Sequence, residues 1–189
     1  ITGQKIVEVM ADLRTVIPVR KKPLCQSETF SSSALAGLED TAVKNEDYAS
    51  VLFRLQDGAS GAFTVSEVSA GHGCYFQVEI NGSKQSYRWN QEENDRLWVG
   101  RRGAENSLII RDPACMDPRA RAYTALAKGH PEGWNDAFLG NIRAFYDFLA
   151  GDRRGERDFA TLKQAARLVR LTEACVESSK ARAWVKVGC

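Results

Sequence analysis

The amino-acid sequence predicts an α+β fold with a large open, mainly antiparallel sheet and with helices packed on one face of it. Two consecutive hairpins between Tyr48 and Trp89 indicate the antiparallel strands. A later run with an apolar residue every three or four positions indicates an amphipathic helix. The strands come first and the helices afterwards, an order that differs from the alternating β-α-β units of a parallel sheet.

The first predicted strand covers residues 6–19, and Pro18 marks its end. Its apolar face consists of four residues at alternate positions, Val7, Val9, Ala11 and Leu13. Residues 20–47 are rich in Ser, Lys, Glu and Gly and have no clear period. We therefore predict a long mobile loop there, with a short helical turn near Leu35. A connection of this length is either functional or loose.

The two hairpins supply the centre of the predicted sheet. Residues 48–55 alternate between apolar and polar side chains, and a turn at residues 56–59 joins them to a second strand over residues 61–68. Asn81-Gly82 joins the two strands of the second hairpin in the same way. Two further short strands follow, at residues 96–101 and 107–111. The sheet therefore has about six strands before the helices begin.

Two helices are predicted after these strands. Residues 134–150 carry one apolar stripe, made of Trp134, Phe138, Ile142, Phe145 and Leu149. Asp158 is the predicted N-cap of a second helix that runs to Arg182. The predicted inward face of this helix contains Leu162, Ala166, Val169 and Val176. Residues 184–187 form a last short strand, added to the edge of the sheet.

The composition limits the classes of protein to which the chain can belong. Its 189 residues suffice for one well-buried domain, and we predict a single domain over residues 1–189. The net charge is only +2 and basic and acidic residues are interspersed, which argues against nucleic acid as a partner. No apolar run approaches the roughly 18 residues of a membrane span, so no membrane partner is expected. The five scattered cysteines lack the Cys/His spacing of a zinc site, and we expect free thiols, no metal and a cytoplasmic location.

His130 is the first candidate site residue, because it lies just before a predicted helix start in the segment Gly129-His130-Pro131-Glu132-Gly133-Trp134. Unpaired backbone amides at a helix N-terminus disfavour a charged imidazole. A neutral histidine there could hydrogen-bond a hydroxyl or carbonyl group of a substrate. It could instead cap a turn and do nothing more, and the spacing alone leaves both interpretations open.

Glu67 and His72 are the next candidates. Glu67 shares a strand face with Phe63 and Val65, where a carboxylate either reaches solvent or lines a pocket. His72 lies on the loop that leaves this strand, and it either faces the same cavity or is exposed. The residues alone therefore indicate a face that binds a small molecule, but they do not determine which side chains belong to it.

Aromatic side chains also project from the predicted sheet, at Tyr87, Trp89 and Trp98. They either lie under the helices or form a subunit interface. The sequence contains no G-x-G-x-x-G turn that opens a β-α unit, no P-loop, no H-E-x-x-H and no G-x-S-x-G. The set of catalytic residues is therefore incomplete.

Several segments resemble the C-terminal domain of the Gfo/Idh/MocA oxidoreductases, in the same order and over nearly the whole chain. They are residues 46–61, 79–84 and 96–100, the segment from Gly129 to Trp134, and Trp184-Val185-Lys186-Val187. Each segment is short, and the specificity comes from their combination and their order.

This resemblance implies the C-terminal part of a NAD(P)-dependent dehydrogenase. In the family, an N-terminal Rossmann domain binds NAD or NADP, and the C-terminal domain holds a sugar, inositol or related polyol whose carbinol exchanges a hydride with the nicotinamide. The resemblance also implies a homo-oligomer that forms through the sheet. The candidate substrate-binding residues that follow from it are His130, Glu67, His72 and Trp134.

The sequence departs from the family pattern at its beginning. The family's Glu-Lys-Pro segment, whose lysine is catalytic, and the Asp/His-bearing helix that opens its C-terminal domain would both lie upstream of Ile1. Gln85 and Thr161-Leu162 also differ from the residues common in the family, which leaves the subfamily open. We therefore expect the isolated chain to be inactive. The alternative is a stand-alone, non-enzymatic module of the same fold, used for dimerisation or for binding a small molecule.

Overall fold

The structure is a computed structural model, and it describes residues 2–24, 37–151 and 158–188. Ten strands and three α-helices form in these ranges. The strands are β1 (Ile6–Arg14), β2 (Val19–Pro23), β3 (Leu38–Ala42), β4 (Tyr48–Leu55), β5 (Ser60–Ser66), β6 (Gln77–Asn81), β7 (Gln85–Asn90), β8 (Arg96–Arg101), β9 (Ser107–Ile110) and β10 (Val185–Lys186). The helices are α1 (Pro118–Arg121), α2 (Trp134–Leu149) and α3 (Leu162–Ala181), with a 3-10 turn at Gln91–Glu93. The strand pairs are antiparallel, which confirms the predicted α+β class with open antiparallel sheets.

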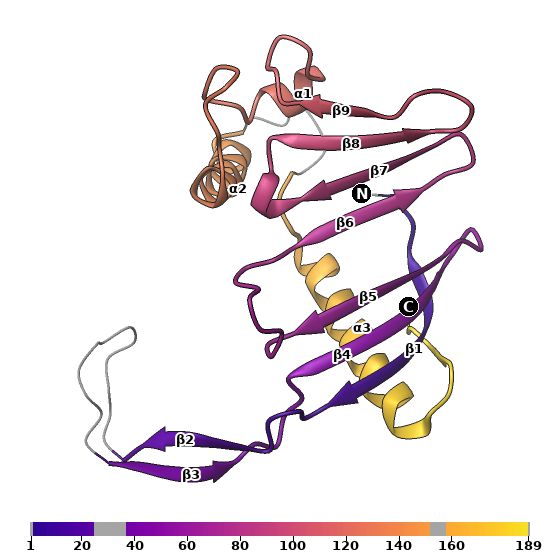
Figure 1. Cartoon of the computed structure of the whole chain (residues 1–189), viewed down its shortest axis with the longest axis vertical. Helices are drawn as coiled ribbons and strands as arrows, with labels where there is room; N and C mark the ends of the chain where they lie inside the picture. Colours follow the sequence, from indigo (N-terminus) through magenta and orange to yellow (C-terminus); the bar gives the residue numbers. More distant parts are fainter. Residues whose placement is uncertain (1, 25–36, 152–157, 189) are drawn as a thin grey trace. The chain divides into compact units, whose positions relative to one another are not determined.

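The chain divides into two compact units. Unit 1 comprises the described residues up to Ala70 and from Thr161 onward, and unit 2 comprises Gly71–Ala160. Unit 1 holds the sheet β10-β1-β4-β5 and a two-stranded β2-β3 ladder, and unit 2 holds the sheet β6-β7-β8-β9 (Figure 1). The two predicted hairpins are both present but belong to different ladders, because the loop after β5 separates them. A single domain over the whole chain stays a prediction.

The core of unit 1 lies between β1, β4 and α3. Its buried residues are Val9, Ala11, Val51, Ala174 and Cys175, with Phe53, Phe63 and Leu171 packed against them. Alternate residues of β1 and β4 thus point to the core, as the period of two predicts. The predicted edge strand is also confirmed, because β10 pairs with β1 at the end of the sheet.

The start and the inward face of α3 differ from the prediction. Thr161, not Asp158, is the N-cap: its Oγ1 accepts a hydrogen bond from the Gln164 amide, and Gln164 Oε1 accepts one from the Thr161 amide. This reciprocal capping box outweighs the general preference for aspartate at such a position. The predicted inward residues Leu162, Ala166 and Val169 are exposed, and Val176 is half-buried. The buried residues are instead Ala174, Cys175 and Ser178, in the second half of the helix.

The prediction that residues 20–47 lack regular structure is wrong for the described part of this segment, whereas its mobility stays a prediction. β2 and β3 form a regular antiparallel ladder with Val19 opposite Ala42 and Pro23 opposite Leu38. We call this two-stranded ladder the arm. Its side chains are mostly exposed on both faces, so the apolar alternation that reveals a half-buried strand is missing from the sequence. The helical turn near Leu35 lies outside the described residues.

Asp47 fixes the root of the arm and explains why β1 ends at Arg14, not at residue 19. Its buried carboxylate accepts hydrogen bonds from the backbone amides of Val16 (2.6 Å) and Ile17 (3.1 Å), and Arg20 lies 3.3 Å away. The hydrogen bond from Val16 is the main cause that holds the pKa of Asp47 below its ordinary value, against an opposing effect of burial. The amides of residues 16 and 17 therefore bond to a side chain and not to a neighbouring strand.

Replacing Asp47 with asparagine is expected to lower the midpoint of thermal unfolding at neutral pH by several degrees. An amide offers one acceptor oxygen in place of a carboxylate's two, and it removes the charge that Arg20 faces. Because the folded-state pKa is depressed, this stabilisation is present above the unfolded-state pKa, about 3.9, and is lost as the pH falls through the folded-state value. Thermal melts of both proteins between about pH 7 and pH 3 should thus converge in acid. Asp57→Asn, the same change on an exposed turn, is the control, and an equal loss in both variants would contradict the assignment.

Unit 2 places α2 beyond one end of its sheet. The predicted helix is confirmed over Trp134–Leu149, and the apolar stripe that its period predicts is present. All five stripe residues are nevertheless exposed. The expectation that helices pack on the sheet is therefore confirmed for α3, which contacts β1, but the apolar stripe of α2 is not covered. A period of 3.6 identifies residues that share a face, and it does not identify what covers that face.

Candidate functional site

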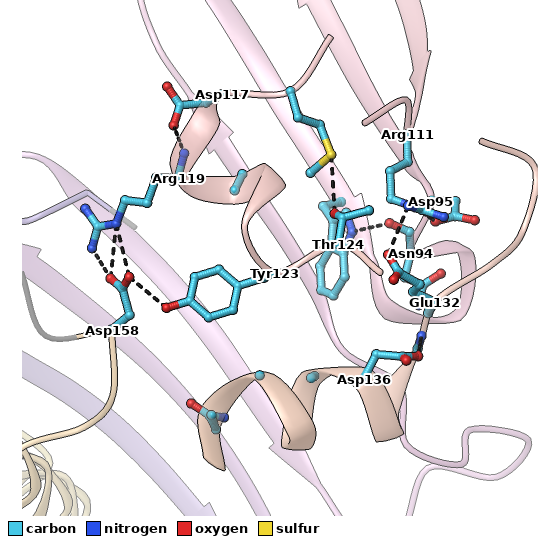
Figure 2. Close-up of a pocket in the computed structure, with 17 residues that line it drawn as sticks. Asn94, Asp95, Arg111, Asp117, Arg119, Tyr123, Thr124, Glu132, Asp136 and Asp158 are labelled. Carbon is cyan, nitrogen blue, oxygen red and sulfur yellow. Dashed lines mark hydrogen bonds and ion pairs between the residues drawn. The ribbon is translucent and has the colours of Figure 1, made fainter. Parts of the chain in front are cut away.

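Unit 2 contains a cavity of about 720 Å³. Its lining comes from the end of β7, the turn after it, the end of β9, α1 and the first half of α2 (Figure 2). Most of the lining residues carry charged or polar side chains, although more of the lining surface is apolar than polar. Trp89, Met116 and several alanine and glycine residues also line the cavity. A concave site with a few placed polar groups is the usual form of a small-molecule site.

Arg111 organises one end of this cavity. Its Nε lies 2.6 Å from Asp95 Oδ1 and its Nη1 lies 2.9 Å from Glu132 Oε2. The same guanidinium donates to the backbone carbonyls of Leu126 and His130. The side chains of Arg111 and Glu132 are only 12% and 11% exposed, so this charge cluster is largely removed from water. It ties the end of β9 to the loop that leads into α2.

Glu132 extends this cluster through hydrogen bonds to backbone groups. Its Oε1 accepts hydrogen bonds from the amides of Ala125 (2.6 Å) and Leu126 (2.9 Å), and its own carbonyl accepts one from the Asn94 side chain. The next residue, Gly133, donates its amide to Asp136 Oδ2 at 2.7 Å, which caps the start of α2. The side chains of Glu132, Asn94 and Asp136 therefore all hold the loop before α2 in place.

A second cluster lies at the opposite end of the cavity (Figure 2). Asp158 accepts hydrogen bonds from Arg119 and, at 2.8 Å, from the Tyr123 hydroxyl. The hydrogen bond from Arg119 holds the pKa of Asp158 below its ordinary value, with a further contribution from Tyr123. Burial, followed by the hydrogen bond to Asp158, raises the pKa of Tyr123. At neutral pH the cluster therefore presents a carboxylate, a guanidinium and a neutral phenol.

These groups could bind a molecule that carries many hydroxyl groups. Carboxylates accept hydrogen bonds, guanidinium groups donate them, and a hydroxyl can do both at once. Trp89 adds an apolar surface to the same wall. In the part of the chain that the structure describes, no group of three His, Cys, Asp or Glu residues is arranged to hold a metal ion.

Two of the predicted site residues lie next to this cavity without forming its wall. The carbonyl of His130 bonds to Arg111, while its imidazole is exposed. Trp134 is the first residue of α2 and is 63% exposed, with its ring 4.4 Å from that of Phe138. The wall reaches Glu132 and Gly133, between these two residues, and among the described lining neither His130 nor Trp134 takes part.

The other two predicted residues lie elsewhere. Glu67 is in unit 1, where it is exposed and lines a cavity of about 460 Å³ at the root of the arm. His72 is in unit 2, with its exposed ring 4.6 Å from that of Tyr75. Contact of His130, Trp134, Glu67 and His72 with a substrate therefore stays a prediction.

The residues that sequence reasoning missed are Arg111, Asp95, Arg119, Tyr123 and Asp158. None of them belongs to a recognisable motif, and Asp158 looks like a helix cap in the sequence. A usable signal was available only for Glu132, because it lies inside the segment around His130. Its partner Arg111 is 21 positions away and becomes visible only in the fold.

Comparison with known proteins extends these observations. Residues 18–187 match the sequence model of the oxidoreductase family, C-terminal alpha/beta domain. No curated protein matches the sequence. The fold is similar to that of an oxidoreductase from Sinorhizobium meliloti, with 25% identity, a TM-score of 0.77, and coverage of 98% of this chain and 47% of that one.

Two further solved structures show the same fold. An oxidoreductase domain protein from Kribbella flavida is 23% identical with a TM-score of 0.80, over 100% of this chain and 47% of its own. An inositol dehydrogenase homolog from Azotobacter vinelandii, complexed with NADH and myo-inositol, is 21% identical with a TM-score of 0.76, over 97% of this chain and 45% of its own. The chain therefore spans just under half the length of the structures it matches. Among the described helices, none has the length and apolar character needed to cross a membrane.

Proposed function

The chain belongs to the Gfo/Idh/MocA oxidoreductase family, as its C-terminal α/β domain, and we propose that it is the substrate-binding and oligomerisation domain of a NAD(P)-dependent dehydrogenase. The proposed substrate is a sugar, inositol or related polyol that exchanges a hydride with the nicotinamide. The observation that carries this proposal is the cavity in unit 2, whose carboxylates, guanidinium groups and phenol suit a ligand with many hydroxyl groups. Similar folds crystallised with NADH and myo-inositol, or with NADH and L-sorbose, support the same class of substrate.

The described residues do not fit a dinucleotide. They contain no glycine-rich turn between a strand and a helix, and the start of α2 is already capped by the Asp136 carboxylate, which would repel a pyrophosphate. In the proposal, NAD or NADP is therefore bound mainly by a Rossmann domain outside this chain, together with the catalytic lysine. We also propose a cytoplasmic location, supported by the free thiols of Cys74, Cys115 and Cys175.

The first experiment is to read the coding sequence upstream of Ile1 in the native gene and to express the complete protein that it encodes. We expect NADH or NADPH formation with at least one member of a panel of polyols, followed by absorbance. A complete protein without a glycine-rich β-α unit that binds a polyol saturably would instead favour the non-enzymatic module of the same fold.

His130→Ala in the complete enzyme is expected to reduce kcat/KM by the equivalent of roughly 1–3 kcal/mol if the imidazole hydrogen-bonds the substrate. The variant keeps the backbone carbonyl that Arg111 binds, so the loop should stay in place. Steady-state kinetics with the best polyol provide the measurement, and Lys84→Ala on the exposed β6-β7 turn is the control. An unchanged kcat/KM would show that the imidazole of His130 does not contact the substrate and that the residue only forms part of a turn.

A further inference from the structure

The two clusters at the ends of the unit 2 cavity differ in what they can still offer a ligand. Each of the three guanidinium nitrogens of Arg111 already has an acceptor, in Asp95, in Glu132 or in a backbone carbonyl. Glu132 Oε1 accepts two backbone amides, and its other oxygen faces Arg111. Because these polar atoms are engaged and the side chains of Arg111 and Glu132 are little exposed, this cluster holds the wall and has little capacity left for a ligand.

Tyr123, at the opposite end, keeps an acceptor that faces no protein group. Its hydroxyl donates its one proton to Asp158 Oδ2 at 2.8 Å, which leaves the lone pairs of the phenol oxygen for a second partner. Among the residues that the structure describes, none donates a hydrogen bond to that oxygen. Tyr123 lines the cavity and is 40% exposed, so a bound molecule can reach it.

The neighbours of Tyr123 fix the direction of this hydrogen bond. Arg119 Nε lies 3.1 Å from Asp158 Oδ1, and the hydrogen bond from Arg119 holds the pKa of Asp158 below its ordinary value. Burial, followed by the hydrogen bond to Asp158, raises the pKa of Tyr123. An ionised carboxylate only accepts hydrogen bonds, so the neutral phenol is the donor. The ring also packs closely on α2, where a Cβ added at Gly140 would lie 3.3 Å from its Cδ1 (Figure 2).

We propose that Tyr123 is a specificity-determining residue of the cavity, whose phenol oxygen accepts a hydrogen bond from one hydroxyl group of the substrate. Asp158 and Arg119 are positioning residues, which keep the phenol proton turned away from the ligand. The substrate is therefore a polyol with a free hydroxyl at the position that faces Tyr123, because a deoxy or O-methyl group there has no proton to donate. This inference rests on the proposed function and narrows its substrate class.

The first test combines Tyr123→Phe with substrate analogues in the complete enzyme. The probes are myo-inositol and D-glucose, each with its single deoxy and single O-methyl derivatives. We expect one position, apart from the reacting carbinol, at which either change raises the wild-type KM about three- to tenfold with little effect on kcat. In Tyr123→Phe the parent polyol should show the same raised KM, and the discrimination at that position should disappear.

A second variant, Asp158→Asn, separates positioning from contact. Arg119 should hold the oxygen of the new amide, so the amide nitrogen faces Tyr123 and donates to the phenol oxygen. The phenol then turns its own proton into the cavity. An ether oxygen accepts but does not donate, so the penalty for the O-methyl analogue should disappear in this variant, whereas the penalty for the deoxy analogue should remain. A purely structural role of Asp158 would instead change the KM values of all analogues together, which would overturn its assignment as a positioning residue.

Tyr146→Phe is the matched control, because it removes a phenol oxygen from an exposed residue of α2 that does not line the cavity. It should keep the wild-type KM values. If the complete enzyme oxidises a polyol and Tyr123→Phe keeps the wild-type discrimination at every position, the inference is overturned and the dehydrogenase role stands. If no polyol is oxidised with NAD or NADP, the proposed function fails instead. Calorimetric titration of the same variants with the same analogues then decides the role of Tyr123, and equal Kd values for parent and deoxy forms at every position in the wild type would overturn it.

Discussion

Replacing Arg111 with methionine is expected to lower the free energy of unfolding by about 2–4 kcal/mol. Methionine fills a similar length of space but donates no hydrogen bond. The change strands two carboxylates, Asp95 and Glu132, in a cluster where the side chain of Glu132 is almost inaccessible to water. It also frees the carbonyls of Leu126 and His130, so the loop before α2 loses one of its anchors. The loss of free energy of unfolding therefore comes from carboxylates left without a cation as well as from lost hydrogen bonds.

Urea unfolding monitored by tryptophan fluorescence would measure this effect. Arg96→Met is the matched control, because Arg96 makes a 3.3 Å pair with Glu93 in which both side chains are more than half exposed. Such a pair contributes about 0–1 kcal/mol. Arg111→Lys should give an intermediate loss, because an ammonium group keeps the charge but cannot span both carboxylates and both carbonyls. Equal losses for Arg111→Met and Arg96→Met would show that the cluster does not hold the loop.

A second consequence concerns binding at the proposed site. The Arg111 cluster shapes one end of the cavity, whereas the Asp158 cluster shapes the other. If the cavity holds the substrate of the complete enzyme, Arg111→Met should also raise KM, since the loop that carries Glu132 forms part of the wall. A stability loss without any change in binding would place the substrate elsewhere.

The sequence predicts those parts of the fold that depend on neighbours in the chain. The alternation in β4 and the step of three and four in α2 are local patterns, and both elements form where these patterns place them. The arm was missed because its residues face water on both sides and leave no apolar period. α3 was given the wrong start because an aspartate was favoured over the pair Thr161 and Gln164, which satisfies two backbone groups at once.

The candidate site is less accessible to sequence reasoning for a related reason. Arg111 and Glu132, or Arg119 and Asp158, are brought together only when β9, α1 and the loop before α2 have their final arrangement. Nothing local distinguishes these charged residues from the others in a chain with 50 charged side chains. The family resemblance identified the segment around His130 as a candidate site. In the structure, it is Glu132 of that segment that bonds to the backbone amides of Ala125 and Leu126 and pairs with Arg111.

Ser178→Ala is expected to destabilise unit 1 by about 1–3 kcal/mol, although it removes a single oxygen atom. Ser178 is fully buried, and its Oγ accepts a hydrogen bond from the Ala11 amide (3.0 Å) and donates one to the Ala183 carbonyl (2.6 Å). Ala11 is in β1 beyond the two residues that pair with β10, so its amide has no ladder partner on that side. The hydroxyl of a helix residue thus completes the hydrogen bonding of a central strand and fixes the turn after α3.

The expected loss follows from what the variant leaves behind. Alanine has a higher helix propensity than serine. Helix propensity would therefore stabilise the variant, and it cannot explain a loss of stability. The cost instead comes from a buried amide and a carbonyl that are left without partners. Thr172→Ala, which deletes an exposed hydroxyl bonded to the Leu168 carbonyl of the same helix, is the control and should stay within about 0.5 kcal/mol of the wild type. Chemical denaturation would compare the two, and amide hydrogen exchange at Ala11 should accelerate only in Ser178→Ala. If both variants behave alike, the link between α3 and β1 rests on the apolar core alone.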